Sequence, residues 1–370
     1  MKKVFYTLAL LIPAILLVVS LSWDVLHFQG AKAATTCQPT TFSQDSVNNL
    51  TAAMIVSNNN STITGPVNGS GCDMGIYINP GLTGITINSA QVFGSTFDGI
   101  VNDGSVVNVS NSQIHDIGAN PLNGVQYGIG IYYTATHTSK GKISNNLIWN
   151  YQKGGIVVKG VGANATITHN TVIGQGPISY IAQNGIEMGA GAKGAITNNI
   201  VYGNSYTGSG VAASGGVLIF GGSCYGTALT IGVKVTGNDL IGNDVGVYLS
   251  NLDGTTCIPT LTPTNIVVTK NIITYDEIEN TTGFSPTAGY QAGISDQGDN
   301  DTMNTNSICG LGYTPATTPP PYLYFIDVTA TNNPNVGVNT SCVDGSTLSM
   351  MAVNNHGSVK HVRTHVKASI

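Results

Sequence analysis

A glutamate and a lysine stand in two short segments of the same kind, residues 155–159 (GIVVK) and 185–189 (GIEMG). If these are adjacent parallel strands with their glycines in register, Lys159 and Glu187 are diagonal neighbours at roughly 7–8 Å. A carboxylate beside an ammonium group can act as acid and base on a glycosidic bond or a uronate. We therefore predict Glu187 and Lys159 as catalytic residues. The alternative is an exposed ion pair worth about 0–1 kcal/mol.

Four further residues are predicted to bind substrate. Tyr132 and Tyr248 occupy outward positions of related segments and offer rings on which a sugar can stack. His115 and Asp116 follow a predicted strand, and histidine titrates near neutral pH. His169 lies in a turn position that other repeats fill with Asn, Gly or Lys, which favours a solvated turn residue over a site residue.

Three acids, Asp296, Asp299 and Asp301, lie close together in the segment DQGDND. Carboxylate oxygens are the ligands that calcium prefers. The spacing differs from that of a known calcium-binding loop. Calcium is thus a candidate ligand, and the sequence establishes no cofactor.

The charge content excludes some partners. Charged residues make up 8% of the chain, and the formal net charge is −5. The repeats contain no basic block, so nucleic acid is excluded as a partner, because neutralising phosphates needs clustered Lys and Arg. Past residue 30 no apolar run is long enough to cross a bilayer.

The elements that position these residues are repeats. Five segments share a β-branched residue, Thr or Ser, any residue, Asn, any residue and an aliphatic. Their asparagines are Asn146, Asn170, Asn199, Asn238 and Asn271. Repeats of this length indicate a solenoid whose coils stack on one another. The asparagines are expected to form one column bonded amide to amide, although an aligned Asn can also donate to a sugar hydroxyl.

A second strand follows each asparagine strand, as in residues 128–132, 155–159, 185–189, 216–220, 246–250 and 293–297. Each begins with a glycine that is predicted to turn the corner. Aliphatic residues two apart then point to one face. On the outward side of these regular strands Glu187 is predicted to be the only acid.

The N-terminus resembles an export signal. It is basic at Lys2 and Lys3, apolar from Tyr6 to Trp23, and reaches an Ala-x-Ala site ending at Ala33. The apolar stretch is long, so an uncleaved membrane anchor is the alternative, and it is the only membrane contact that we predict. Either way the repeats lie outside the cytoplasm, in a secreted or cell-surface protein.

Cysteine spacing agrees with export, because the six cysteines form successive pairs about one coil apart. Stacked coils place equivalent residues about 4.8 Å apart, which suits a disulfide. The oxidising compartment favours disulfides over free thiols, and no Cys-x-x-Cys pair suggests zinc. The predicted pairs are Cys37–Cys72, Cys224–Cys257 and Cys309–Cys342.

The domain organisation follows from these signals. Residues 1–33 are a signal peptide or anchor, and residues 34–84 an N-terminal cap with the first coils, in which 47–56 is a candidate capping helix. Residues 85–349 are the solenoid, and 350–370 a loosely ordered tail rich in His and basic residues.

The repeats at about 85–300 resemble the right-handed parallel β-helix repeats of the pectate-lyase-like superfamily. The resemblance implies an all-β fold with three strands per coil and an Asn-bearing turn between two sheets. It also implies a polysaccharide bound along an outer sheet. The fold hosts lyases, hydrolases, epimerases and adhesins, so it does not select an activity.

The catalytic motifs of the best-known members do not carry over. Pectate lyases use an arginine and an acidic calcium cluster, whereas the only arginine here is Arg363 in the tail. The Asn-Thr-Asp, Asp-Asp, Gly-His-Gly and Arg-x-Lys motifs of polygalacturonases are absent. The sequence therefore favours a protein that binds extracellular polysaccharide without catalysis, and a polysaccharide lyase or hydrolase is the alternative.

Overall fold

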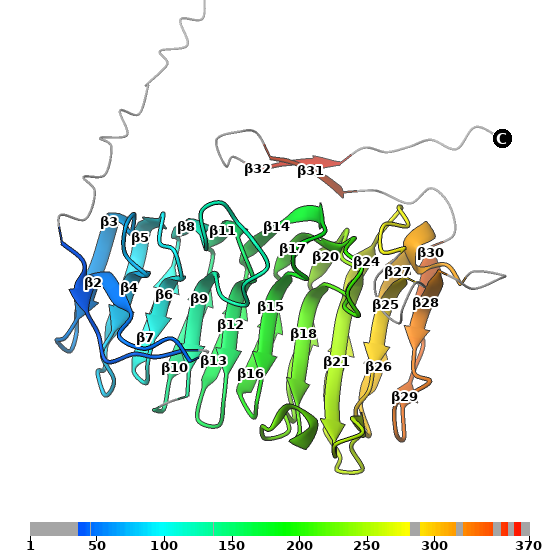
Figure 1. The fold of residues 1–370 in the computed structure, drawn as a ribbon. Helices are drawn as coiled ribbons and strands as arrows, with labels where there is room; N and C mark the ends of the chain where they lie inside the picture. Colours follow the sequence, from blue (N-terminus) through cyan, green and yellow to red (C-terminus); the bar gives the residue numbers. More distant parts are fainter. Residues whose placement is uncertain are drawn as a thin grey trace, which may run out of the picture. The chain divides into compact units, whose positions relative to one another are not determined.

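The chain winds into stacked coils whose strands are parallel (Figure 1). The computed structural model describes residues 36–44, 46–135, 137–281, 289–315, 321–342, 349–353 and 359–363. The predicted signal segment at 1–33 lies outside the described residues. The architecture is the predicted right-handed parallel β-helix, and each regular coil contributes three strands.

One strand of each coil joins a 12-stranded sheet that runs the length of the solenoid. Within it only β1 and β22 are antiparallel to their neighbours, β2 and β21. Its strands are β1 (Gln38–Pro39), β2 (Thr51–Val56), β4 (Met74–Ile78), β6 (Asp98–Asn102), β9 (Ile129–Thr134), β12 (Gly154–Lys159), β15 (Asn184–Gly189), β18 (Gly215–Gly221), β21 (Val245–Asp253), β22 (Ile258–Pro259), β25 (Tyr290–Asp296) and β28 (Tyr322–Asp327).

The other two strands of each coil form an 18-stranded sheet with two parallel stacks, which the long strands β3 (Thr62–Asn68) and β5 (Ile85–Phe93) join at the N-terminal end. The first stack contains β7 (Val106–Ser110), β10 (Lys140–Ser144), β13 (Asn164–Thr168), β16 (Lys193–Thr197), β19 (Lys234–Thr236), β23 (Val267–Thr269), β26 (Thr302–Asn304) and β29 (Asn335–Val336). The second contains β8 (Gln113–Ile117), β11 (Leu147–Tyr151), β14 (Thr171–Ile178), β17 (Ile200–Tyr206), β20 (Asp239–Ile241), β24 (Ile272–Thr274), β27 (Ser307–Cys309) and β30 (Thr340–Cys342).

Rows of aliphatic side chains fill the interior. One row takes a single residue from each of eight strands of the 12-stranded sheet, β4 to β25, and every member is fully buried. The row runs through Ile76, Ile100, Ile131, Ile156, Ile186, Val217, Val247 and Ile294. The stacking of like residues follows from the repeat, since each coil buries its apolar face only against its neighbours.

A glycine precedes each residue of this row, and its role is not the predicted one of turning a corner. Gly155 and Gly185 lie inside their strands rather than at a corner. A Cβ on Gly155 would lie 2.6 Å from the carbonyl oxygen of Gly185 in the next coil and 2.3 Å from Val172. Glycine is required here because the coils approach too closely for any side chain.

The predicted asparagine column exists and is longer than predicted. Each side-chain amide donates to the carbonyl oxygen of the next, at 2.9–3.0 Å, and all but the last residue are at most 2% exposed. The column lies at the turn between the two stacks of the 18-stranded sheet. Its members are Asn146, Asn170, Asn199, Asn238, Asn271, Asn306 and Asn339.

The residue before each of the first six asparagines has a left-handed backbone. His169 has φ 56° and Lys270 φ 58°, and both are exposed. This conformation favours Asn and Gly, which fill the position in other coils. His169 is therefore a solvated turn residue.

Several details differ from the prediction or complete it. Residues 51–56 form strand β2 and not a capping helix, because Thr51–Val56 pairs with β4 as the first coil. In the predicted tail, β31 (Ser349–Val353) pairs antiparallel with β32 (Val359–Arg363). Two one-turn 3₁₀ helices, η1 (Ser223–Tyr225) and η2 (Leu311–Tyr313), complete the fold. No helix among the described residues is long and apolar enough to cross a membrane.

Two predicted disulfides are present. The Cα atoms are 5.5 Å apart in Cys37–Cys72 and 5.0 Å apart in Cys224–Cys257. Cys309 is also disulfide-bonded, and the strand register places it opposite Cys342. The Cys342 side chain lies outside the described atoms.

Candidate functional site

The outer face of the 12-stranded sheet carries the residues that the sequence singled out. Because the strands are in register, one outward residue of each coil falls in a single row. The row runs through Ile55, Tyr77, Val101, Tyr132, Val157, Glu187, Leu218, Tyr248, Ser295 and Asp327. Glu187 of β15 is the first charged side chain in this row, directly after Val157 of β12.

The N-terminal part of this face is covered. Residues 40–44 and 46–50, which we call the N-terminal flap, cross in front of β4 and β6 toward β9 (Figure 1). Phe42 of the flap packs against Tyr77 and Tyr132, with ring centroids 5.8 and 6.4 Å apart. Leu50 and Val101 are buried in the same cluster. The flap therefore ends where the charged residues begin.

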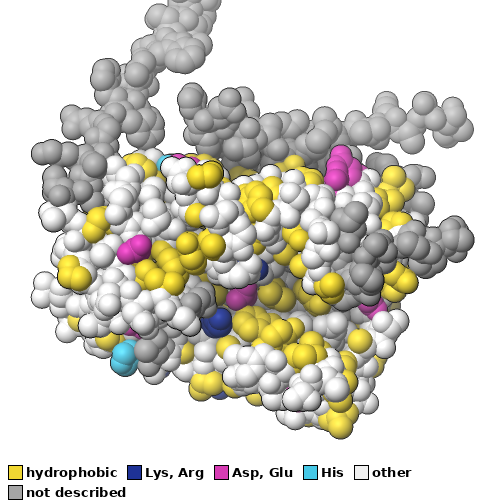
Figure 2. Space-filling model, in the orientation of Figure 1, with side chains coloured by type: hydrophobic (Ala, Val, Ile, Leu, Met, Phe, Trp, Pro, Cys, Tyr) yellow, Lys and Arg dark blue, Asp and Glu magenta, His cyan; other side chains and the backbone are white. Residues whose placement is uncertain are grey.

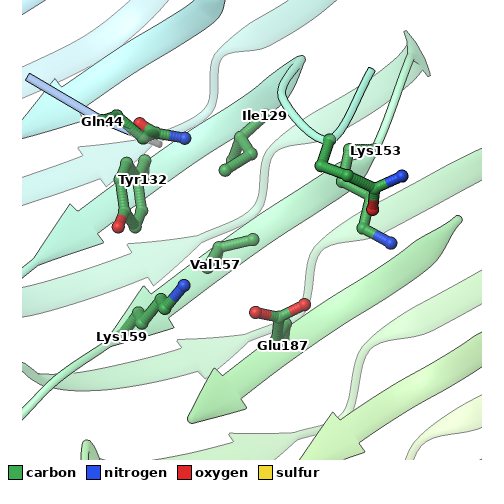
Figure 3. Close-up of a pocket in the computed structure, with 8 residues that line it drawn as sticks. Gln44, Ile129, Tyr132, Lys153, Val157, Lys159 and Glu187 are labelled. Atoms are coloured by element: carbon green, nitrogen blue, oxygen red, sulfur yellow. The ribbon is translucent and has the colours of Figure 1, made fainter. Parts of the chain in front are cut away.

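A hollow of about 180 Å³ lies at this boundary, over β9, β12 and β15. Figure 2 shows basic and acidic side chains among hydrophobic ones on this face, and Figure 3 shows the lining residues. The lining residues are Gln44, Gln126, Ile129, Tyr132, Lys153, Val157, Lys159 and Glu187. The flap, the loop before β9 and the three strands thus build one site.

Glu187 and Lys159 have the predicted relation. Val157 is the register partner of Glu187, and Lys159 that of Gly189, so the two charged residues are diagonal neighbours. Both line the hollow (Figure 3). The amide of Asn184 donates to Oε2 of Glu187 at 3.3 Å and helps to fix the carboxylate.

Lys153 is the site residue that sequence reasoning missed. Its ammonium group donates to the carbonyl oxygen of Ala182 at 2.9 Å. Burial lowers the pKa of Lys153; the nearby Glu187 carboxylate opposes this shift, and the positive charge of Lys159 adds to it. The available signal was a lysine directly before a Gly-Gly strand start in a chain with few charges.

The charged groups of the hollow remain unpaired with one another. Within the described part of the chain, no ion pair of 4 Å or less joins Glu187 to Lys153 or Lys159. The predicted alternative, a simple surface ion pair, is therefore not what forms. The two ammonium groups and the carboxylate instead leave space between them.

The two tyrosines predicted to bind substrate differ in position. Tyr132 lines the hollow with its ring against the flap. Tyr248 lies two strands beyond Glu187, outside the lining residues, and packs against Tyr290 and Val245. Burial is the main cause that raises the pKa of Tyr248.

His115 and Asp116 lie on the 18-stranded sheet, apart from the hollow. The imidazole stacks between Phe93 and Trp149, with ring centroids 5.3 and 4.2 Å away. Nδ1 of His115 lies 2.7 Å from the Asp116 carboxylate, and this hydrogen bond is the main cause that lowers the pKa of Asp116. Asn150 also bonds Asp116. These contacts make the pair part of a surface ladder rather than of the hollow.

The carboxylates of the three acids predicted to bind calcium are buried in the protein interior. Asp296 accepts hydrogen bonds from Gly298 and Thr331, and Asp301 accepts them from Thr264 and Ile266. Asp299 is likewise buried and bonded within the protein. Burial, and then the charge of Asp296, raises the pKa of Asp301 to about 8. Among the described residues no three acidic, His or Cys side chains are grouped so that they could hold a metal ion.

Glu187 is not the only acid on the outer side of the sheet. Asp327 ends the same row and accepts a hydrogen bond from the Tyr290 hydroxyl at 2.6 Å. Asp98 is fully buried, and its Oδ1 accepts from the Ile129 amide. Both carboxylates are engaged within the protein, so Glu187 is the acid that faces the hollow.

Comparison with known proteins adds a fold likeness. No family model and no curated protein matches the chain. Among solved structures, the chain is similar to the A-module of the mannuronan C-5 epimerase AlgE4 from Azotobacter vinelandii. The identity is 14%, the similarity covers 77% of this chain and 91% of that module, and the TM-score is 0.36. A likeness at this level assigns no role to any residue here.

Proposed function

We propose that the protein binds an extracellular polysaccharide on the outer face of the 12-stranded sheet, and that the hollow receives a sugar unit bearing a carboxylate. The observation that carries this proposal is the group of two lysines and one glutamate that line a single hollow without pairing. Their net charge is positive, in a chain whose net charge is −5. A ligand carboxylate restores the missing partner of the lysines.

The remaining lining suits a sugar. Gln44 and Gln126 supply amide donors and acceptors for hydroxyl groups. Ile129, Val157 and the ring of Tyr132 supply an apolar surface. A concave site with a few convergent polar groups on an apolar floor is the usual form of a small-ligand site. The disulfides fit an oxidising, extracellular location.

Isothermal titration calorimetry with galacturonate chains and a matched neutral glucan tests this function. We expect binding of the uronate, weakened by added salt, and no binding of the glucan. Lys159→Met should lower the affinity about tenfold. Lys142 is exposed on β10 of the other sheet, so Lys142→Met is the matched control and should change nothing. Equal affinity for both polymers, or equal effects of the two variants, would contradict the proposal.

A second function, proton abstraction from a bound uronate, is favoured by one observation. Lys153 lines the hollow, and burial lowers its pKa, which reduces the cost of forming the neutral amine. Such an amine can take the C5 proton next to the sugar carboxylate, whose charge Lys159 offsets. The bond from C4 to the glycosidic oxygen then breaks, a C4–C5 double bond forms, and the departing oxygen takes a proton from water. Two-carboxylate hydrolysis is less suited, because Glu187 is the only carboxylate among the described lining residues.

The two functions are separated by product analysis. If the site is catalytic, the ultraviolet absorbance of an unsaturated uronate appears, and Lys153→Met abolishes it. Release of reducing sugar without that absorbance would indicate hydrolysis instead. If neither product forms while the titration still shows binding, the protein is a binder.

A further inference from the structure

The hollow is closed on the side of the first coils. β1 pairs antiparallel with β2, and the flap between them returns on itself: the Thr40 amide donates to the Leu50 carbonyl at 3.0 Å. At the tip, Gln44 and Val47 exchange two backbone hydrogen bonds, at 3.0 and 2.9 Å. The disulfide from Cys37 to Cys72 ties the base of the flap to the solenoid. The flap, which forms this wall of the hollow, is therefore tied to the solenoid at its base and closed on itself at its tip.

The wall presents a polar group to the hollow. Gln44 lies beside Tyr132 at the edge of the hollow (Figure 3). Its Oε1 is buried and has no hydrogen-bond partner among the described residues. A buried acceptor without a donor costs free energy, and rotation of the Gln44 amide toward a ligand hydroxyl in the hollow can remove that cost.

The opposite side of the hollow continues as an aromatic surface. A Cβ on Gly189 would lie 1.9 Å from the Phe220 ring, so this glycine lets Phe220 of β18 lie back over β15. The Lys159 ammonium is 5.8 Å from the Phe220 ring centroid. Tyr225 packs edge-on against Phe220 and is 43% exposed. Figure 2 shows that hydrophobic surface borders the charged hollow on this face.

We propose that the site accepts the end of a glycan chain and not its interior. The terminal unit lies in the hollow against Gln44, and the following units run toward the C-terminal coils over Phe220 and Tyr225. This inference rests on the proposed function and adds the direction of the chain. The wall excludes an internal unit, because such a unit would need an open path on both sides. Aromatic rings accept successive units through their apolar faces.

Binding stoichiometry distinguishes a chain end from an interior. Calorimetry or analytical ultracentrifugation with galacturonate chains of increasing length should give one protein bound per chain, whatever its length. A number of bound proteins that rises in proportion to chain length would overturn the inference and leave the proposed function intact. Absence of binding to every chain would overturn both.

Removing the flap should convert binding at the chain end into binding along the whole chain. Pro39 and Thr51 are register partners, so an Asn-Gly turn can replace residues 40–50 and join β1 to β2. In this variant the number of proteins per chain should rise with chain length. An unchanged ratio in the folded variant would contradict the role of the wall.

Point variants test the same idea without rebuilding the fold. Tyr225→Ala should weaken the binding of longer chains about tenfold and leave the binding of a monomer unchanged. Tyr202 is 36% exposed on the other sheet, so Tyr202→Ala is the control and should leave both unchanged. Gln44→Ala should weaken monomer and chain equally. Loss of monomer binding in Tyr225→Ala would place the first unit elsewhere and overturn the proposed direction.

Discussion

The asparagine column and the hollow are built on opposite principles. In the column, the same residue type does the same thing in seven successive coils, and every amide has its partners within the column or on neighbouring carbonyls. In the hollow, Lys159 and Glu187 have no charged counterpart at the register positions of the neighbouring strands, and the charged groups of Lys153, Lys159 and Glu187 are not paired with one another. Repetition and satisfied polar groups mark structure, whereas unique and unpaired groups mark a place for a ligand.

The two regions should therefore respond differently to substitution. Changes in the column should act on stability and leave binding alone unless the coils separate. Changes in the hollow should act on binding and leave stability nearly unchanged. The four predictions below begin with the largest expected effect.

Asn199→Ala should lower the free energy of unfolding most. Asn199 Oδ1 accepts from both the backbone amide and the side-chain amide of Asn170, and its Nδ2 donates to Ile167, Thr197 and Asn238. The substitution leaves several buried groups unsatisfied, at about 1–3 kcal/mol each. We expect a loss of about 3 kcal/mol or more by urea denaturation.

The matched control is Asn164→Ala, because Asn164 is exposed at the start of β13. It should change stability by less than about 0.5 kcal/mol. Similar losses in the two variants would show that position in the column has no special importance.

Stability should also depend on pH through Asp244. This carboxyl is fully buried, and burial raises its pKa to about 7 against donors such as Ser205 and Asn280 that lower it. A folded-state pKa above the unfolded one means that the native state binds more protons. Stability is therefore greatest below about pH 4 for this group and falls as pH rises toward 7, by at most about 1.4 kcal/mol per pH unit.

Urea denaturation across this pH range measures the slope. Asp244→Asn should reduce the slope, and the variant will be less stable throughout because an amide nitrogen replaces an acceptor. Asp276 is exposed, and Asp276→Asn should retain the wild-type slope. Part of the slope should remain, because burial also raises the pKa of Asp301, to about 8. A slope in Asp244→Asn that equals the wild-type slope would contradict the prediction.

The fold could be predicted from the sequence because its signal is repeated in every coil. Where the repeat motif becomes irregular, the sequence no longer predicts which asparagines belong to the column. Asn306 and Asn339 belong to the column, but Met303 and Asn304 replace the usual β-branched residue and Thr of the motif. Their place is set by stacking on earlier coils and not by local pattern.

The candidate site was only half predictable for the same reason. Lys159 and Glu187 sit on regular strands, so the register placed them correctly. Lys153 and Gln44 sit on connections, and long-range packing against Ala182 and Tyr132 brings them to the hollow. His115 was included in the predicted site because of its chemistry. It lies on the 18-stranded sheet, away from the hollow.

Lys153→Met should separate binding from stability. Methionine fills a similar volume without a buried charge, and only the bond to the Ala182 carbonyl is lost. We expect stability within about 1 kcal/mol of wild type and an affinity for galacturonate chains lowered about tenfold. Thermal denaturation and calorimetry on the same preparation give both values. A large loss of stability with intact affinity would place Lys153 among the structural residues instead.

Glu187→Gln should have the smallest effect on stability and on affinity, and the direction of the change in affinity is informative. Glutamine keeps the shape, and its oxygen can still accept from Asn184, so stability should stay within about 0.5 kcal/mol. The carboxylate repels a uronate carboxylate held by the two lysines. Its removal should therefore tighten uronate binding by less than about tenfold, a gain below 1.4 kcal/mol. Weaker binding by calorimetry would mean that Glu187 accepts a hydrogen bond from a sugar hydroxyl instead, because an amide is the poorer acceptor.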